Sequence, residues 1–141
     1  MAQGLQAQGW SDVPLLAVET RGADSFAASV QAGHLVTLER ISSVATSLGA
    51  RTVTARALEW TRHHPITPWV VTDREAVDAC LRFADDHRVL VEPACGAALS
   101  VAYNRAAPLE GREPVVIIVC GGAGVTRELL DKWDRETAGP A

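Results

Sequence analysis

Short apolar runs alternate with helical periodicity along this chain of 141 residues. The runs at residues 13–18, 69–72 and 115–119 each have the length of a buried strand. The last run, VVIIV, is apolar and β-branched, which is typical of a strand buried on both faces at the centre of a sheet. Because helical segments separate these runs, the sequence predicts an α/β fold made of βα units around a parallel sheet.

The helical segments carry recognisable start signals. Thr72 and Glu75 have the Thr-x-x-Glu spacing of a capping box, with an apolar stripe behind them, so a helix is predicted to begin there. Pro93 suits the first turn of an Ala-rich helix that runs to about Arg105. The other predicted helices cover residues 24–32, closed by Gly33, residues 41–48, closed by Gly49, residues 53–60, and a last segment from about Val125.

The composition is that of a folded globular domain, with 48% hydrophobic and 21% charged residues. No linker or internal repeat divides residues 1–141. Thirteen basic against 17 acidic residues give a net charge of −4, which argues against nucleic acid and anionic membranes as partners. We expect neither a secretion signal nor a membrane span. The three cysteines lack CxxC spacing, which predicts reduced thiols and a cytoplasmic location.

Several common kinds of site are not predicted. The sequence has no GxSxG, HExxH or GxxxxGK[ST] motif, and its four histidines are too scattered to predict a zinc site. Lys132 is the only lysine, and its charged surroundings predict a solvated helix face. Any chemistry that needs a lysine amine from this chain would depend on that one residue.

Polar features at the ends of the predicted strands are open to two interpretations each. Cys120 follows the strand at 115–119, where open α/β sheets bind ligands, although spacing alone favours a small buried side chain. The CGGAG that begins there either brings amides to a ligand or forms a tight turn. Glu92 is a candidate functional carboxylate or a hydrogen-bond acceptor at a helix start. Residues 19–25 offer the oxygen ligands that a simple cation prefers.

Four stretches together resemble the L-serine dehydratase and serine dehydratase-like family, pyridoxal-phosphate enzymes of the β-family, or fold type II. They are GWSDVPLLAVETRGADSF, LVTLERISSVATSLGARTV, VLVEPACGAALSVAY and VVIIVCGG. The resemblance implies the large domain of such an enzyme, which deaminates L-serine, and often L-threonine, to pyruvate or 2-oxobutyrate plus ammonia. It also implies a homodimer. Because it covers only the carboxyl-terminal part of a family member, we expect residues 1–141 to be a single partial domain, truncated at the N-terminus.

The resemblance also assigns binding residues. Cys120 matches the cysteine whose sulfur faces the pyridine nitrogen of pyridoxal 5'-phosphate, and Gly121 lies beside it. The positions that match the family's loop for a monovalent cation, potassium, are Glu19, Ala23, Ser25, Leu48 and Ala50. Ala123 and Gly124 depart from the Ser-Asn that commonly follows CGG in the family, so we expect no polar side-chain contact from that part of the turn.

The resemblance assigns no catalytic residue to this chain. In the family, the lysine that binds the cofactor and the loops for its phosphate and for the substrate carboxylate lie upstream of the matched region. Lys132 lies in the wrong segment. We therefore expect the chain alone to be inactive. Two alternatives stay open: a non-enzymatic remnant that binds or modulates a full-length relative, and an unrelated α/β nucleotide-binding protein that uses CGGAG.

Overall fold

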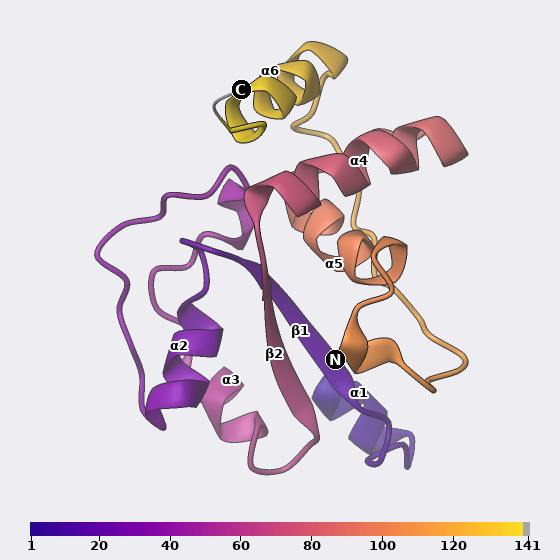
Figure 1. The fold of residues 1–141 in the computed structure, drawn as a ribbon. Coiled ribbons are helices and arrows are strands. Elements are labelled where there is room, and N and C mark those ends of the chain that lie inside the picture. The colour runs from indigo at the N-terminus through magenta and orange to yellow at the C-terminus, as the bar shows by residue number, and fades with distance from the viewer. Residues whose placement is uncertain (140–141) are drawn as a thin grey trace.

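A pair of parallel strands lies at the centre of the computed structural model, which describes residues 1–139 (Figure 1). The strands are β1 (Leu15–Thr20) and β2 (Ile66–Val71), paired in register along their whole length. Parallel neighbours require a crossover connection, and the helical segment between the two strands provides it. The predicted α/β class with a parallel sheet is confirmed.

Helices cover both sides of this strand pair. They are α1 (Ala2–Ala7), α2 (Ser25–Ala32), α3 (Ala55–Trp60), α4 (Asp73–His87), α5 (Pro93–Tyr103) and α6 (Arg127–Thr137), with 3-10 turns at Thr46–Leu48 and Ala107–Leu109. α2 and α3 lie on one side of the strands and α5 on the other, with α4 packed on α5 and α6 on α4 (Figure 1). The structure confirms the helices predicted at residues 24–32, at 53–60, after Thr72, after Pro93 and from about Val125, whereas α1 was not predicted.

Both strands differ in their bounds from the prediction. β1 begins and ends two residues later than the predicted 13–18, so Glu19 belongs to the strand. β2 begins at Ile66 rather than at residue 69, so Pro68 lies within the strand. Proline has no N–H to donate to a neighbouring strand, so it is tolerated in an edge strand but not in a central one. The sequence interpretation used Pro68 only as a helix breaker.

The capping box at the start of α4 is present as predicted. The Thr72 hydroxyl accepts a hydrogen bond from the Glu75 N–H, and the Glu75 carboxylate accepts one from the Thr72 N–H. These bonds satisfy two amides that the first helical turn leaves without a partner. Behind them, α4 buries Ala76, Val77 and Cys80 against the rest of the core.

The helix predicted at residues 41–48 is wrong, and only the 3-10 turn Thr46–Leu48 forms there. Partners that are distant in the sequence bind the backbone amides of this segment instead. The Ser42 N–H donates to the Gly22 carbonyl, and the Val44 N–H donates to the Asp73 carboxylate. Ala45 is fully buried although the segment is not helical, because the backbone conformation follows these hydrogen bonds.

The strand predicted at residues 115–119, central and buried on both faces, is also wrong for the described residues. The segment is extended, but within residues 1–139 no strand pairs with it. Ile117 and Val119 pack against the core between α4, α5 and α6, whereas Val116 and Ile118 face outward with 82% and 52% of their surface exposed. The sequence pattern could not show this, because burial on the second face requires a neighbouring strand.

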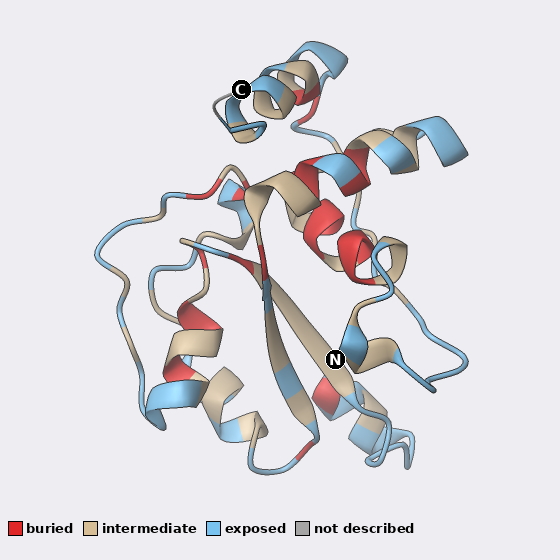
Figure 2. Ribbon diagram, viewed as in Figure 1, coloured by how far each residue is buried: buried red, intermediate tan, exposed pale blue. Residues whose placement is uncertain are grey.

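Two apolar clusters hold these layers together. One joins Cys80, Cys95, Leu99 and Leu130 between α4, α5 and α6. The other joins Val71, Ala76, Ala97 and Val101 between the strand pair and the two central helices. Figure 2 shows the resulting concentration of buried residues along α4 and α5 and at the strand ends. α5 therefore lies between the sheet and the outer helices, and its first turn faces the segment that contains Cys120.

Candidate functional site

The CGGAG segment forms a turn against the first turn of α5. The Glu92 N–H donates to the Gly121 carbonyl over 3.1 Å, and the Glu92 carboxylate accepts from the Gly124 N–H over 3.4 Å. Gly121 has a φ of +131°, a conformation that side chains other than glycine rarely adopt. CGGAG therefore forms a tight turn, and ligand binding by its amides stays a prediction. Glu92 occupies the helix-start position, yet its side chain binds the turn rather than a helix amide.

Cys120 stands on this turn with an exposed side chain, so the alternative of a small buried residue is wrong. Its backbone N–H points inward and donates to the Cys95 sulfur over 3.3 Å. A Cβ atom built at Gly121 would meet no atom within 4 Å, which leaves open space beside the backbone at that point. The exposed Cys120 thiol therefore lies next to open space at Gly121, whereas Gly122 is packed against Leu90.

The predicted cation residues Glu19 and Ser25 lie near the end of β1 and at the start of α2. Glu19 turns its carboxylate to the first turn of α2, where it accepts hydrogen bonds from the Phe26 N–H at 3.0 Å and the Ala27 N–H at 2.8 Å. The Ser25 hydroxyl donates to the Ala50 carbonyl at 2.7 Å. This bond ties the start of α2 to the segment after the 3-10 turn.

The remaining predicted cation residues lie in the same two loops. Ala23 is fully buried just before α2, and the Leu48 carbonyl accepts a hydrogen bond from the Ala50 N–H over 2.8 Å. The set therefore offers only hard oxygen donors: a carboxylate, a hydroxyl and backbone carbonyls. Such a set suits a simple cation rather than a soft metal. No cluster of histidine, cysteine and acidic side chains suited to holding a metal ion occurs among the residues described.

Burial makes the negative charge of Glu19 costly. Desolvation raises its pKa above the ordinary value of 4.5, and nearby Asp24 adds to the rise, while the amides of Phe26 and Ala27 oppose it. A cation beside the carboxylate would compensate this charge. The cation loop itself stays a prediction.

Lys132 lies on the exposed side of α6, as predicted. Its side chain is 59% exposed, and its amine lies 3.8 Å from the Glu136 carboxylate one turn along the same helix. Burial or a positive neighbour would be needed to activate a lysine amine as a nucleophile. The position of Lys132 therefore offers no covalent anchor for a cofactor at Cys120.

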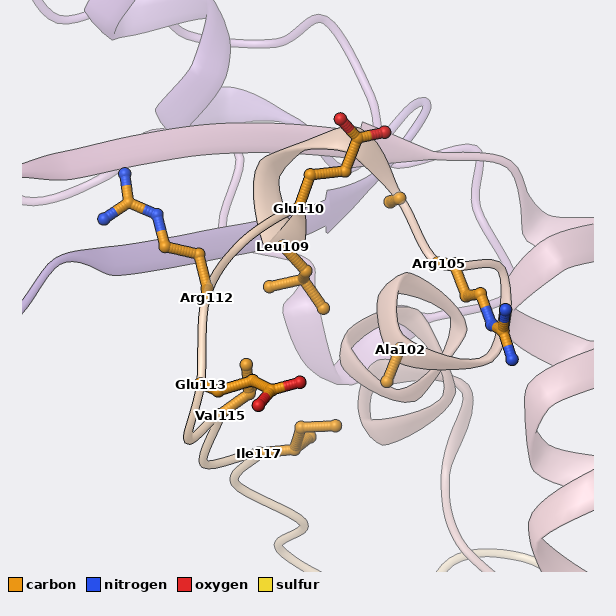
Figure 3. A pocket seen from close by; sticks show the side chains of 9 residues that line it. Ala102, Arg105, Leu109, Glu110, Arg112, Glu113, Val115 and Ile117 are labelled. Atoms are coloured by element: carbon orange, nitrogen blue, oxygen red, sulfur yellow. The ribbon is translucent and has the colours of Figure 1, made fainter.

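The sequence did not predict a pocket of about 560 Å³. It lies between the end of α5, the 3-10 turn Ala107–Leu109 and the extended segment after Pro114. Figure 3 shows Ala102, Leu109 and Ile117 turned toward this space, while Arg112 points away from it. Neither Cys120 nor Glu19 contributes to its lining, so the hollow is separate from both predicted binding regions.

Sequence reasoning also missed Cys95, which contacts the turn from α5. Its apolar surroundings in the sequence predict an ordinary core residue, and it is indeed buried. Only the folded chain shows that its sulfur reaches Cys120 and Gly121, which lie 25 and 26 residues further along.

Comparison with known proteins agrees with this architecture. A fungal L-serine ammonia-lyase from Rhizomucor miehei superimposes with a TM-score of 0.92 at 40% identity, covering 96% of this chain and 45% of that protein. Maize serine racemase superimposes with a TM-score of 0.75 at 26% identity, covering 94% and 42%. These neighbours are fold type II enzymes, so the predicted fold class is confirmed.

The amino-acid sequence gives the same result. The profile described as "Pyridoxal-phosphate dependent enzyme" matches residues 1–121. The chain is 50% identical to human L-serine dehydratase/L-threonine deaminase over 134 residues, which cover 89% of this chain and 41% of the human protein. It is 51% identical to rat serine dehydratase-like over 137 residues, covering 92% and 42%.

The structure defines an α/β protein with a glycine-rich turn packed against the first turn of α5. The chain belongs to the family of pyridoxal-phosphate dependent enzymes, and the predicted resemblance to serine dehydratases is confirmed. It spans about two fifths of the length of the curated relatives it matches. Within residues 1–139, none of the helices has the length and apolarity required to cross a bilayer.

Proposed function

We propose that this chain forms one wall of the pyridoxal phosphate site, and a potassium loop, of an L-serine/L-threonine ammonia-lyase. The complete enzyme converts L-serine to pyruvate, or L-threonine to 2-oxobutyrate, and releases ammonia. The observation that carries the proposal is the exposed Cys120 thiol on a turn whose backbone is held by α5. The 50% identity to human L-serine dehydratase/L-threonine deaminase supports the choice of reaction.

In this proposal, Cys120 and Gly121 hold the pyridine end of the cofactor. When bound, pyridoxal phosphate supplies the electron-withdrawing ring that labilises bonds at the α-carbon of the substrate. A thiol is a weak hydrogen-bond donor, so Cys120 cannot keep the ring nitrogen protonated as a carboxylate can. A less electron-poor ring favours loss of the β-hydroxyl over amino-group transfer. Cys120 therefore biases the reaction toward elimination.

Glu19, Ala23, Ser25, Leu48 and Ala50 form the cation loop of the proposal. The half-buried carboxylate of Glu19 supplies the charge, and carbonyl oxygens supply the remaining ligands. A potassium ion there would tie the carboxyl end of β1 to the loop before α3. Through this link the ion would stabilise the large domain without touching the substrate.

The chain alone lacks the covalent anchor, because Lys132 lies exposed on α6. We propose that the amine and the phosphate loop come from the rest of the longer polypeptide, and that this chain by itself is inactive. The homodimer and the cytoplasmic location stay predictions.

Mixing with a complementary half tests the function. Pyridoxal phosphate is added to this chain, then to this chain together with the remaining segment of a close relative such as the human enzyme. We expect a cofactor absorbance band that borohydride removes only in the mixture, together with pyruvate release from L-serine. A band and activity from this chain alone would contradict the proposed division of the site.

A second candidate function is a non-enzymatic remnant that binds a full-length relative. The unpaired, outward-facing residues of the extended segment favour it, because they leave a surface that a second polypeptide could cover. Absence of the band with and without the complement, together with capture of the full-length relative, would favour the remnant. The alternative of an unrelated nucleotide-binding protein is wrong, because the chain belongs to the pyridoxal-phosphate dependent enzymes.

A further inference from the structure

Two residues at the start of α5, Glu92 and Cys95, bind the CGGAG turn. Glu92 uses its backbone N–H and its carboxylate, which contact Gly121 and Gly124. Cys95, one helical turn further on, uses only its sulfur. This sulfur accepts a hydrogen bond from the Cys120 N–H at 3.3 Å and lies 3.6 Å from the Gly121 carbonyl, to which the thiol donates.

The two contacts of Cys95 lie at the two ends of the dipeptide Cys120–Gly121. They engage the N–H that precedes the Cys120 Cα and the carbonyl of the next residue, Gly121. A group that binds both ends of a dipeptide restricts the backbone rotations between them, and with them the direction of the Cys120 Cβ. The Cys120 side chain is exposed while its backbone is bound by Cys95 on the buried side. These two contacts of Cys95, called the clamp below, therefore orient the Cys120 thiol outward.

We propose that Cys95 is a positioning residue of the cofactor site. Its buried thiol fixes the backbone of Cys120 and Gly121, and so sets where the Cys120 sulfur meets the cofactor ring. This inference rests on the proposed function for its purpose, although the clamp itself is a property of this chain.

Helix packing prevents α5 from adjusting to a shorter side chain at residue 95. A Cβ at Gly96 would collide with the Ala76 carbonyl and with the Cys80 sulfur, so α5 already lies in close contact with α4. A Cβ at Gly122 would collide with the Leu90 carbonyl, so the turn is pressed against the chain before α5. The distance between α5 and the turn, which the Cys95 sulfur bridges, is therefore fixed on both sides. A serine hydroxyl oxygen lies closer to its Cβ than a cysteine sulfur does, so it bridges this distance less well.

Cys80 provides a matched control on the neighbouring helix. It is a buried cysteine in the same apolar cluster, and its thiol donates to the Glu92 carbonyl rather than to the turn. Burial, with a smaller contribution from nearby Cys95, raises the pKa of the Cys80 thiol to about 12, so it stays a neutral side chain. Truncation of Cys80 removes a similar volume from the same core without touching Cys120 or Gly121.

The experiment measures backbone amide exchange by NMR in the full chain without cofactor. We expect Cys95→Ala to speed exchange of the Cys120 amide about tenfold relative to the core amides of α4, since that amide loses its partner. Cys95→Ser should restore part of the protection. Cys80→Ala should leave the ratio unchanged. Equal acceleration in Cys95→Ala and Cys80→Ala would overturn the clamp.

If Cys95→Ala fails to fold, the serine variants of Cys95 and Cys80 are compared in the same way. Equal exchange of the Cys120 amide in these two variants would again overturn the clamp.

A second readout uses the mixture with the complementary half. We expect Cys95→Ala, and not Cys80→Ala, to shift the absorbance maximum of the bound cofactor. A wild-type mixture that binds no cofactor would overturn the proposed function, and the exchange ratio would still decide the clamp.

Discussion

The imidazole of His64 is buried between α3 and β2, with 3% of the residue exposed. Within residues 1–139 neither of its ring nitrogens has a hydrogen-bond partner. A buried polar group without a partner carries a desolvation cost, so an apolar side chain of similar size should be tolerated better. We predict that His64→Leu raises the free energy of unfolding by about 1 kcal/mol, as measured by urea denaturation.

The neighbouring His63 is the control for this prediction, because it is exposed and packs edge-on near Trp60. His63→Leu should change the free energy of unfolding by less than about 0.5 kcal/mol. A loss of stability in His64→Leu would show that the imidazole makes a favourable polar contact.

Glu19 carries a pH-dependent prediction. Its folded pKa is raised, chiefly by burial, so its contribution to stability is present below the ordinary value of 4.5 and is lost as pH rises through the raised value. A bound cation offsets that loss. We predict that potassium raises the melting temperature at neutral pH by about 2–4 °C, but not below pH 4.5, where Glu19 is protonated.

The measurement compares thermal unfolding in potassium chloride and in tetramethylammonium chloride at equal ionic strength. Glu19→Gln should abolish the difference between the two salts, whereas Glu39→Gln, at an exposed position, should preserve it. A potassium effect that survives in Glu19→Gln would remove Glu19 from the proposed cation loop.

Among the elements, those defined by their own sequence were predicted well. α4 begins at a capping box formed by Thr72 and Glu75, and α2 ends at Gly33 in the left-handed conformation. Both helix ends are therefore determined by residues that are close together in the sequence. The segment at 41–48 depends instead on Gly22 and Asp73, which are far away in the sequence. Apolar spacing cannot reveal such partners, and the predicted helix was wrong for that reason.

The loop between residues 41 and 50 is held by a buried polar chain. The hydroxyls of Thr20 and Ser43 lie 2.7 Å apart, and the Ser43 hydroxyl donates to the Asp73 carboxylate over 2.5 Å. Ser43→Ala leaves the buried Thr20 hydroxyl without this partner. We predict a loss of about 1–3 kcal/mol in the free energy of unfolding, measured by urea denaturation.

Ser47→Ala is the matched control for Ser43→Ala, because Ser47 is exposed in the same loop. It should change the free energy of unfolding by less than about 0.5 kcal/mol. Because this loop contains Leu48 and Ala50, Ser43→Ala should also weaken the potassium effect on the melting temperature. Equal stability of the two variants would show that the polar chain contributes little.

For the whole molecule, the sequence predicted the binding residues mainly through family resemblance. The structure brings Ser25 and Ala50 into contact and exposes Cys120, which spacing alone did not require. Cys95 could not be predicted, because its role depends on the packing of α5 against a turn 25 residues later. The central position of residues 115–119 was wrong because a strand needs partners that the described residues do not supply.

The outward face of the extended segment determines how the chain should behave in solution. Val116 and Ile118 are exposed, and the backbone between them has no ladder partner within residues 1–139. An unpaired β-branched segment of this kind is a template for pairing with another chain. We therefore predict that the isolated chain self-associates, as measured by sedimentation velocity across a range of concentrations.

Lysines on the outward face should suppress this association without damage to the core. The double variant Val116→Lys/Ile118→Lys adds charge to the exposed side only, so the monomer fraction should rise while the melting temperature changes little. Ile117→Lys buries a charge in the cluster with Leu130 and should unfold the chain. Leu35→Lys, at an exposed apolar residue in another loop, should leave association unchanged. A wild-type chain that stays monomeric and melts cooperatively would show that the outward face needs no partner.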